Sequence, residues 1–189
     1  MRTLAITQNT TVDGAVEMLD DWFTPQGQDE VDDSDLVEEI HRQDERADAL
    51  LLGRQTFEDF RGYWPGRTDD PSGISAYLDR VQKYVVSTTL TEPGWPHTTV
   101  LDGDPVEHVR ALKEQPGADI VVTGSITLCH TLIGAGLVDE LRLFTYPVVQ
   151  GRGRRLFPEG FACPQLELLD TKRFRSGVAF TRYRATPQP

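Results

Sequence analysis

Short apolar segments alternate with helical segments along most of the chain, and this alternation is the feature that most restricts the fold. The predicted strands are the apolar runs Thr3–Thr7, Ala49–Leu52, Lys83–Ser87, Thr98–Leu101, Ala118–Thr123 and Glu140–Val149. The predicted helices are Ser34–Arg46, a segment from Arg54 onward, Asp104–Glu114 and Ser125–Gly136. Strands and helices in alternation predict a mostly parallel sheet with helices packed on it.

The last part of the chain changes to a period of two residues. Leu166–Phe174 and Val178–Arg184 alternate around Ser176-Gly177, a pair typical of a hairpin turn. We therefore predict an α/β fold, with a mostly parallel central sheet flanked by helices and a C-terminal antiparallel hairpin at one edge. Since 189 residues suffice for one core, we expect a single domain over residues 1–185 and a tail at 186–189.

Charge and composition exclude several classes of protein. The net charge of −11 disfavours nucleic acid as a partner. The acidic residues gather between Asp29 and Asp48, which we interpret as the solvated face of a helix with Ser34 as its N-cap.

Neither a membrane span nor a metal site is expected. No apolar run approaches the roughly 20 residues that cross a bilayer, and the first residues lack a secretory signal. The four histidines are scattered without metal-ligand spacing, and Cys129 and Cys163 do not suggest a disulfide scaffold. We therefore expect a cytoplasmic protein.

Two strand ends lead into glycine-containing turns that suit an anion. At the first, Gly53 permits close approach of a ligand to the backbone, and the helix behind it offers unpaired N–H groups. Arg54 and Thr56 add a cation and a hydroxyl, although a capped helix start with a surface arginine explains them equally simply. At the second, Thr123-Gly124-Ser125 has the same character, and Ser125 is alternatively a plain N-cap.

A third strand end carries only hydroxyl groups, in Ser87-Thr88-Thr89. We expect all three segments to be strand-to-helix junctions at neighbouring strand ends, where a sheet of this kind binds its ligand. Neither a G-x-G-x-x-G nor a G-x-x-x-x-G-K-[ST] motif is present, so the sequence supports neither a Rossmann fold nor a P-loop.

Five ordered motifs resemble the dihydrofolate-reductase-like superfamily, in the branch that contains the reductase domain of bacterial riboflavin biosynthesis. They are Thr11-Val12-Asp13-Gly14, Leu52-Gly53-Arg54-Gln55-Thr56-Phe57-Glu58, Thr123-Gly124-Ser125 with Leu128, Gly136-Leu137-Val138-Asp139-Glu140-Leu141, and the segment Tyr146–Phe157 with its P-V-V-x-G-x-G core. The resemblance covers nearly the whole chain. It implies NADPH as cofactor, with NADH as the alternative, and hydride transfer to a pterin-like or aminopyrimidine ring.

The resemblance also assigns roles to matching positions. It places Gly53, Arg54 and Thr56, with Gln55 between them, near the adenosine-phosphate side of the cofactor. It places Gly124, Ser125 and Ile126, with Thr123 and Leu128 in the same motif, around the pyrophosphate. Ser87 and Thr88 would lie near the adenine ribose. Members of the superfamily are often dimers, so we expect a homodimer.

The sequence departs from the family pattern in three places. Thr88 stands where many relatives have arginine, which leaves Arg54 as the main cation for a 2′-phosphate. Asp35, Glu38 and Glu39 occupy the region of the first-helix carboxylate of dihydrofolate reductases, and none aligns cleanly. The H-x-E and P-C-x-x-C signatures of a fused zinc deaminase are missing.

Several residues are candidates for the substrate side. Asp13 either orients the substrate or stabilises the turn at Gly14. Asp21 is the candidate proton donor, and the neighbouring Trp22 and Phe23 suit a flat heterocycle or belong to the core. Tyr146 either reaches this pocket or packs beside it. Arg152, with Arg154 and Arg155, either grips a substrate phosphate or forms an exposed loop.

Three functions fit these observations. The first is an NADPH-dependent reductase of a small heterocycle. The second is a binding module that keeps the dinucleotide site without catalysis. The third is a reductase of an unrelated carbonyl or imine, because one fold serves many substrates.

Overall fold

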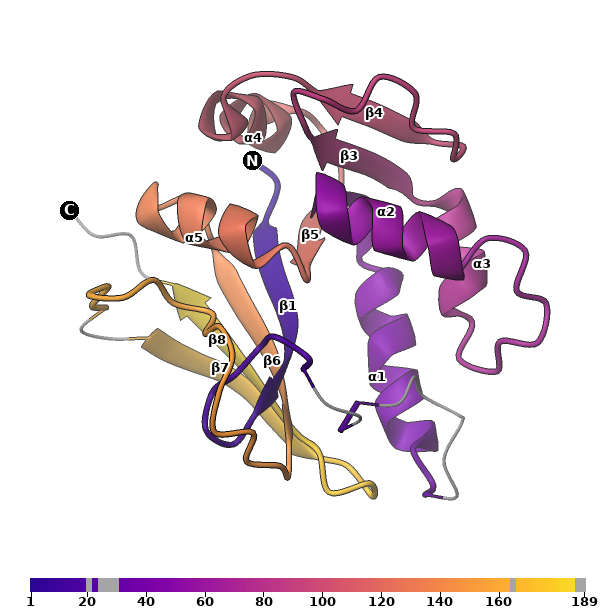
Figure 1. Cartoon of the computed structure of the whole chain (residues 1–189). Helices are drawn as coiled ribbons and strands as arrows, with labels where there is room; N and C mark the ends of the chain where they lie inside the picture. Colours follow the sequence, from indigo (N-terminus) through magenta and orange to yellow (C-terminus); the bar gives the residue numbers. More distant parts are fainter. Residues whose placement is uncertain (20–21, 24–30, 164–165, 186–189) are drawn as a thin grey trace.

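The computed structural model of the chain describes residues 1–19, 22–23, 31–163 and 166–185. These residues form an eight-stranded sheet with the order β4-β3-β2-β5-β1-β6-β8-β7 (Figure 1). The strands from β4 to β6 in this order are parallel, and β8 and β7 are antiparallel to their neighbours. The strand bounds are β1 Leu4–Thr11, β2 Ala47–Gly53, β3 Gln82–Val86, β4 Thr98–Leu101, β5 Asp119–Thr123, β6 Glu140–Tyr146, β7 Leu166–Arg173 and β8 Ala179–Ala185. The predicted fold class is confirmed.

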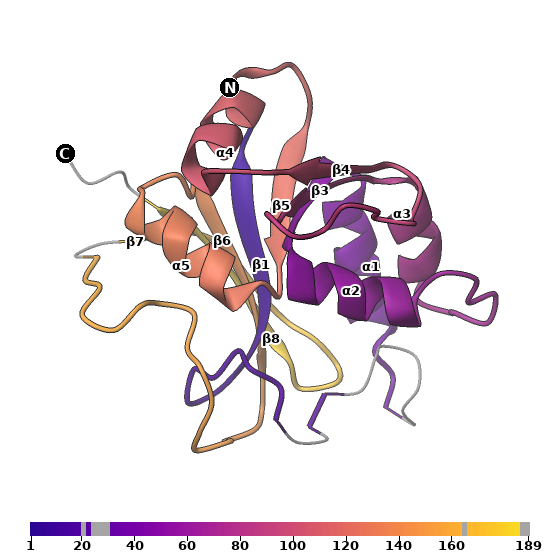
Figure 2. The same ribbon diagram turned by 45° about the horizontal axis from the view of Figure 1, so that its top comes forward.

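Helices cover both faces of the sheet (Figure 2). Successive residues of a strand point to opposite faces, so Leu51 and Leu50 of β2 belong to different cores. Leu51 packs in the cluster that contains residues of α4 and α5, whereas Leu50 packs with residues of α2 and α3. A third cluster contains Leu36 of α1 and Phe144 of β6. The helix bounds are α1 Ser34–Asp44, α2 Arg54–Tyr63, α3 Ile74–Arg80, α4 Pro105–Glu114 and α5 Ile126–Gly134.

Most predicted elements are confirmed, with shifted ends. β1 continues to Thr11, and β6 ends at Tyr146 because Pro147 has no N–H group for the ladder. Asp104 caps α4 as expected, since its Oδ1 accepts a hydrogen bond from Val106 N at 2.9 Å. The C-terminal hairpin turns at Gly177, which has a φ of 87°.

Two local predictions are wrong, and one short helix is missed. Asp33 rather than Ser34 is the N-cap of α1, and the Ser34 hydroxyl donates to Asp32 Oδ1 at 2.7 Å. The segment after β3 leads into strand β4 and not into a helix. The short helix α3 is not predicted, because its seven residues follow a left-handed Gly73 and are too few for a clear helical period.

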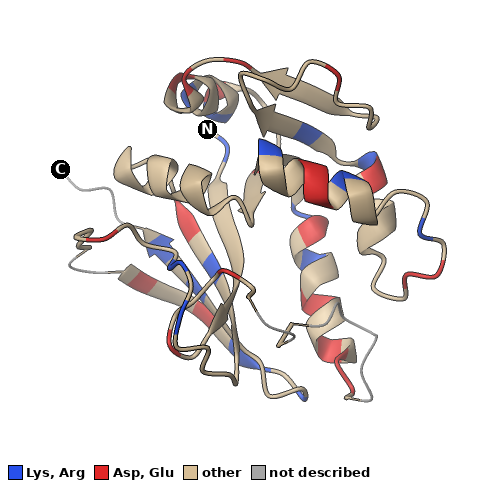
Figure 3. Ribbon diagram, viewed as in Figure 1, with Lys and Arg blue, Asp and Glu red and all other residues tan. Residues whose placement is uncertain are grey.

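The acidic helix α1 is only partly a solvated face. Figure 3 shows acidic residues, coloured red on the ribbon, at several positions along this helix. Glu39 is 5% exposed and pairs with Arg42 and Lys172. Asp44, at the end of the helix, lines the cleft described below. The interpretation of the whole acidic run as solvated is therefore wrong for these two residues.

A buried arginine connects strands that are not neighbours. Arg142 of β6 is 1% exposed and donates to Asp119 Oδ2 of β5 at 2.5 Å. It also donates to Glu140 Oε2 at 2.9 Å. Because β1 lies between β5 and β6, this ion pair joins two strands across the central strand.

We predict that Arg142→Met destabilises the fold by about 3 kcal/mol, because it leaves the largely buried carboxylates of Asp119 and Glu140 without a cation. The matched control is Arg184→Met, which breaks an exposed pair with Glu167 and should cost at most about 1 kcal/mol. Urea unfolding of both variants measures the difference. Equal losses would show that the buried pair contributes no more than the exposed one.

Candidate functional site

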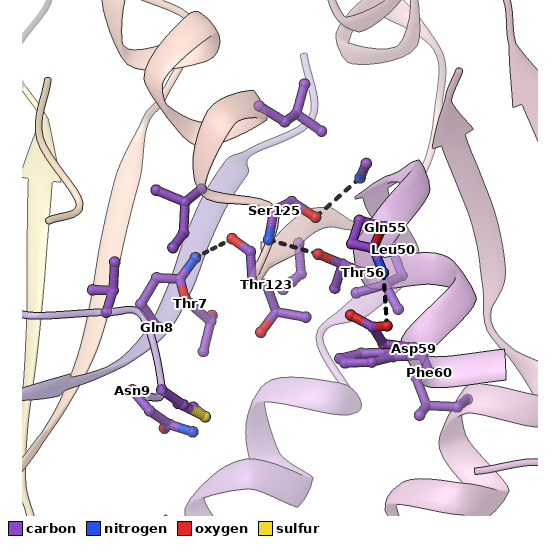
Figure 4. Close-up of a pocket in the computed structure, with 18 of the residues that line it drawn as sticks. Thr7, Gln8, Asn9, Leu50, Gln55, Thr56, Asp59, Phe60, Thr123 and Ser125 are labelled. Atoms are coloured by element: carbon purple, nitrogen blue, oxygen red, sulfur yellow. Dashed lines mark hydrogen bonds between the residues drawn. The ribbon is translucent and has the colours of Figure 1, made fainter. Parts of the chain in front are cut away.

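A cleft of about 610 Å³ opens at the carboxyl ends of β2 and β5, on the face of the sheet that carries α1, α2 and α3. It is lined by Thr7 of β1, by Thr123 of β5 and by residues of these three helices. Figure 4 shows the lining side chains at this edge of the sheet. Sheets with parallel strands bind ligands at this position, so the cleft is the candidate active site.

Two reciprocal hydrogen bonds hold the β2–α2 and β5–α5 junctions together. Gly53 N donates to Ser125 Oγ at 2.9 Å, and Ser125 N donates to Thr56 Oγ1 at 2.9 Å (Figure 4). We call this pair of bonds the Gly53–Ser125–Thr56 clamp. Each hydroxyl accepts within the clamp through a lone pair, so its own hydrogen is left to donate to a ligand.

The clamp places two helix N-termini beside the cleft. Helix α2 begins at Arg54 and α5 at Ile126, and both residues line the cleft. The first N–H groups of a helix have no partner within it, and the helix dipole favours an anion there. Two such ends on neighbouring strands suit a ligand with two linked phosphates.

Gly124 is required by the geometry of the clamp. Its φ is +56°, and a Cβ at this position would lie 2.8 Å from Thr56 Cγ2. Its carbonyl accepts a hydrogen bond from Gln8 Nε2 at 2.5 Å, which fixes the turn to the central strand β1. The next residue, Ser125, is also left-handed, with a φ of +46°. The turn therefore depends on a residue without a side chain.

The structure brings together nine of the eleven residues predicted to bind the cofactor. The residues that line the cleft are Gly53, Arg54, Gln55, Thr56, Thr123, Gly124, Ser125, Ile126 and Leu128. Ser125 is the N-cap position of α5 as predicted, but its side chain bonds Gly53 N instead of its own helix. Arg54 pairs along the helix with Glu58 at 3.1 Å.

Ser87 and Thr88 do not line the cleft. Ser87 Oγ accepts hydrogen bonds from Thr89 N at 3.1 Å and Leu90 N at 2.9 Å, so it stabilises the turn after β3. Val86 pairs in register with Gly53, which places this turn one strand beyond the clamp at the same edge. The expected adjacency of the three strand ends is therefore present, and the ribose role of Ser87 and Thr88 stays a prediction.

Of the substrate-side candidates, Phe23 lines the cleft. Trp22 and Tyr146 do not line it but contact the Phe23 ring edge-on, with centroids 6.1 Å and 5.7 Å away. Arg152 also lies outside the lining, whereas Arg154 is part of it and pairs with Glu17 at 2.8 Å. Asp21, the candidate proton donor, lies outside the described residues.

Asp13 holds the loop after β6 in place. Its carboxylate accepts from Thr11 Oγ1 at 2.6 Å, Gln150 N at 3.1 Å and Gly151 N at 2.8 Å. These hydrogen bonds lower the pKa of Asp13 to about 2, with the Thr11 bond contributing most. The contacts support the structural alternative for Asp13 over direct contact with a substrate.

The sequence patterns do not predict the inner part of the cleft. Its apolar lining comes from α1, α2, α3 and the sheet, with Ile40, Leu50, Phe60, Trp64, Ile74 and Leu78 among the residues. Asp44 and Tyr77 also line it. Burial raises the pKa of Asp44 to about 7, against the opposing charges of His41 and Arg80. The one sequence signal for Asp44 in the cleft is its spacing. It follows Leu36 and Ile40 at intervals of four residues, which places all three on the same face of α1.

Among the described residues, no cluster of His, Cys, Asp or Glu is arranged to hold a metal ion. The helices within the same residues are all too short or too polar to cross a membrane.

The sheet order defines a dihydrofolate-reductase-like α/β domain, and the clamped cleft is a candidate ligand site at the carboxyl edge of its sheet. The chain matches the family model for the RibD C-terminal domain over residues 2–180, and it belongs to that family. The family resemblance expected from the five motifs is thus confirmed.

Relatives and solved structures agree with this assignment. The uncharacterized protein YyaP of Bacillus subtilis (strain 168) is 36% identical over 134 residues, which are 69% of this chain and 70% of YyaP. A pyrimidine reductase-like protein from Corynebacterium diphtheriae has a TM-score of 0.66 at 15% identity, covering 99% of this chain and 93% of its own. Dihydrofolate reductase from Enterococcus faecalis, complexed with NADP(H), has a TM-score of 0.64 at 18% identity, covering 97% of both chains. At these identities the two structures show the fold alone.

We predict that Gly124→Ala lowers the free energy of unfolding by about 2 kcal/mol or more. The substitution places a side chain on a left-handed backbone and creates a contact that Thr56 cannot relieve without breaking the clamp. Gly53→Ala is the matched control. Gly53 has a φ of −77°, and an added Cβ would meet Ser125 at an ordinary distance of 3.8 Å. The free energy of unfolding of this variant should therefore change by about 0.5 kcal/mol or less. Chemical unfolding compares the two, and equal stabilities would rule out the strained turn.

We also predict a pH-dependent gain in stability for Asp44→Asn. The folded pKa of about 7 lies above the ordinary value of 3.8, so the wild type loses stability as pH rises from about 4 to 7 and the loss stays complete above that range. The neutral variant avoids this loss. Its thermal midpoint should match the wild type near pH 4 and exceed it at pH 8 by about 2–4 °C or more. Parallel profiles in calorimetric scans from pH 4 to 8 would contradict this.

Proposed function

We propose that this chain is an NADPH-dependent reductase that transfers a hydride to a small heterocyclic ring, such as a pteridine or an aminopyrimidine. The observation that carries the proposal is the Gly53–Ser125–Thr56 clamp, with two helix N-termini held beside one cleft. Membership of the RibD C-terminal domain family supports it. So does the dihydrofolate-reductase-like fold, because the enzyme from Enterococcus faecalis was solved with NADP(H).

The residues of the clamp suit the phosphates of a dinucleotide. The left-handed turn at Gly124 lets Thr56 pack against the backbone before α5, which sets the clamp beside the N-terminus of that helix. Gly124, Ser125 and Ile126 would hold the pyrophosphate, and Gly53, Arg54 and Thr56 would lie on the adenosine-phosphate side. Ser87 and Thr88, one strand further along the edge, would contact the adenine ribose.

Arg54 is the residue that would favour NADPH over NADH. Its side chain is 48% exposed and pairs with Glu58 on the helix surface. Exposed pairs of this kind contribute at most about 1 kcal/mol, so a 2′-phosphate can compete with Glu58 for the guanidinium. Because Thr88 supplies no second cation, the preference should be moderate.

When bound, NADPH supplies the hydride that the acceptor carbon receives. The chain itself would position the two rings and exclude water from them, and the apolar side chains of the cleft are suited to this. Asp21 or water would donate the proton. The homodimer and the cytoplasmic location predicted from the sequence belong to this proposal as well.

The test is a calorimetric titration of NADPH and NADH into the wild type and two variants. Ser125→Ala removes a hydroxyl from the clamp and should weaken NADPH binding about tenfold, the effect of one hydrogen bond to a charged group. Thr131→Ala removes a hydroxyl from the same helix that bonds only Thr127 O at 3.2 Å, and it should leave binding unchanged. Absence of uptake of either nucleotide by the wild type would overturn the proposal.

Turnover separates the remaining alternatives. Oxidation of NADPH in the presence of pterins or aminopyrimidines is the expected result. Oxidation of NADPH only with carbonyl or imine compounds would show that the substrate is not a heterocycle of this kind. Tight binding without oxidation across all these compounds would indicate a dinucleotide-binding module.

A further inference from the structure

A second, smaller cavity lies between the C-terminal half of α1 and the antiparallel part of the sheet. Its volume is about 60 Å³, several times the roughly 10–15 Å³ that one water molecule needs. The lining residues come from α1, the segment after it, and strands β6, β7 and β8: Glu39, Arg42, Gln43, Arg46, Arg142, Asp170, Lys172, Phe180 and Arg182. Only Gln43 also lines the large cleft, so this cavity is a separate site beside it.

Positive charge predominates in this lining. Five of the nine lining residues are arginine or lysine, and two, Glu39 and Asp170, are acidic. Glu39 is shared by two of the cations, since it pairs with Arg42 and, at 2.5 Å, with Lys172. Asp170 lies 3.6 Å from the same Lys172. Within the described residues, neither acid forms an ion pair with the arginines that the sheet contributes to the cavity.

The two arginines from the sheet are neighbours. Arg142 of β6 pairs in register with Arg182 of β8, so both side chains project from the same face. The Cβ atoms of such partners lie about 4.5–5.5 Å apart, and like charges placed directly opposite each other are destabilising. A negatively charged ligand between the two guanidinium groups would remove this repulsion.

Both arginines also have a buried nitrogen atom without a partner. Arg142 is 1% exposed, and its Nε and Nη2 donate to Glu140 and Asp119. Its Nη1 has no hydrogen-bond partner within the described residues, and the same holds for Arg182 Nε. Buried polar atoms nearly always have partners, so two such donors beside one cavity indicate a ligand that accepts hydrogen bonds from both.

We propose that this cavity binds a small tetrahedral oxyanion, sulfate or inorganic phosphate, between Arg142 and Arg182. The oxygen atoms of such an ion accept from Arg142 Nη1 and Arg182 Nε at once, as charge-assisted hydrogen bonds. The exposed lining residues Arg42 and Arg46 add positive charge around it. A volume of about 60 Å³ lies far below the roughly 300–1,000 Å³ of sites for larger organic ligands, which excludes a dinucleotide.

The bound anion would connect α1 to the sheet. Arg142 and Arg182 belong to β6 and β8, whereas Arg42 belongs to α1. Since α1 also lines the large cleft, the anion would stabilise one wall of that cleft. A ligand that binds only the folded state adds to its stability, so the anion should also protect the protein from unfolding.

The first test is a calorimetric titration of sodium sulfate into the protein at constant ionic strength. Arg182→Met keeps an apolar side chain but removes the charge and the Nε donor, so it should weaken sulfate binding about tenfold or more. The matched control is Arg110→Met, which removes the same charge from an exposed pair with Glu107 on α4, outside the cavity. It should change the affinity less than about twofold.

Three results of this titration would overturn the proposal. The first is no uptake of sulfate by the wild type, and the second is equal affinity of the wild type and Arg182→Met. The third is a loss of binding in Ser125→Ala that Arg182→Met does not show, because it would place the ion at the clamp.

Thermal unfolding adds a readout that a purely structural role of Arg182 would not give. Without sulfate, Arg182→Met should unfold at the wild-type temperature or above it, because the repulsion with Arg142 is removed. Sulfate should then raise the midpoint of the wild type more than that of the variant. The comparison at one salt concentration cancels the general effect of sulfate on protein stability. An equal rise in both proteins would contradict a specific site.

A wild-type crystal soaked with selenate locates the ion directly through the anomalous signal of selenium. The expected result is a selenate with oxygen atoms about 2.7–3.2 Å from Arg142 Nη1 and Arg182 Nε. Ordered water alone in the cavity, or selenate bound only elsewhere, would overturn the proposal. This experiment uses no variant, so it decides the question even where Arg182→Met does not fold.

Discussion

The pair of hydrogen bonds between Gly53, Ser125 and Thr56 is the interaction on which the candidate site depends. It joins two junctions that are about seventy residues apart in the sequence, and it fixes the N-termini of α2 and α5 beside each other. It also explains why Gly124 must lack a side chain, since Thr56 occupies the space a Cβ would need. The same pair of hydrogen bonds therefore stabilises the turn, places the N-termini of both helices and positions the hydrogen-bond donors beside the cleft.

The cleft itself follows from how the helices on this face divide the core. Residues of α2 and α3 pack in one cluster with Leu50, whereas α1 packs in another with Phe144. The two clusters stay separate, and the space between them opens toward the clamp. Asp44 and Tyr77 line this space together with the apolar side chains of the three helices.

The sequence predicts the parallel sheet and both clamp junctions, because apolar runs that end in Gly53 or Gly124 are local signals. It does not predict the clamp, since the bond from Gly53 N to Ser125 Oγ depends on β2 and β5 being neighbours. Helix α3 is not predicted, because its seven residues are too few to show a clear helical period. Asp44 is missed because a run of acidic residues resembles a solvated face, and its fourfold spacing from Ile40 becomes meaningful only once α1 is placed against the sheet.

A crystal structure of the protein soaked with NADPH tests the central claim most directly. The account predicts pyrophosphate oxygens within hydrogen-bonding distance of the first backbone N–H groups of α2 and α5, with the Ser125 and Thr56 hydroxyls donating to the same phosphates. It further predicts that the Gly53–Ser125–Thr56 clamp is unchanged by binding. A dinucleotide bound elsewhere, or a clamp that opens and fills the cleft with the protein's own side chains, would contradict the account.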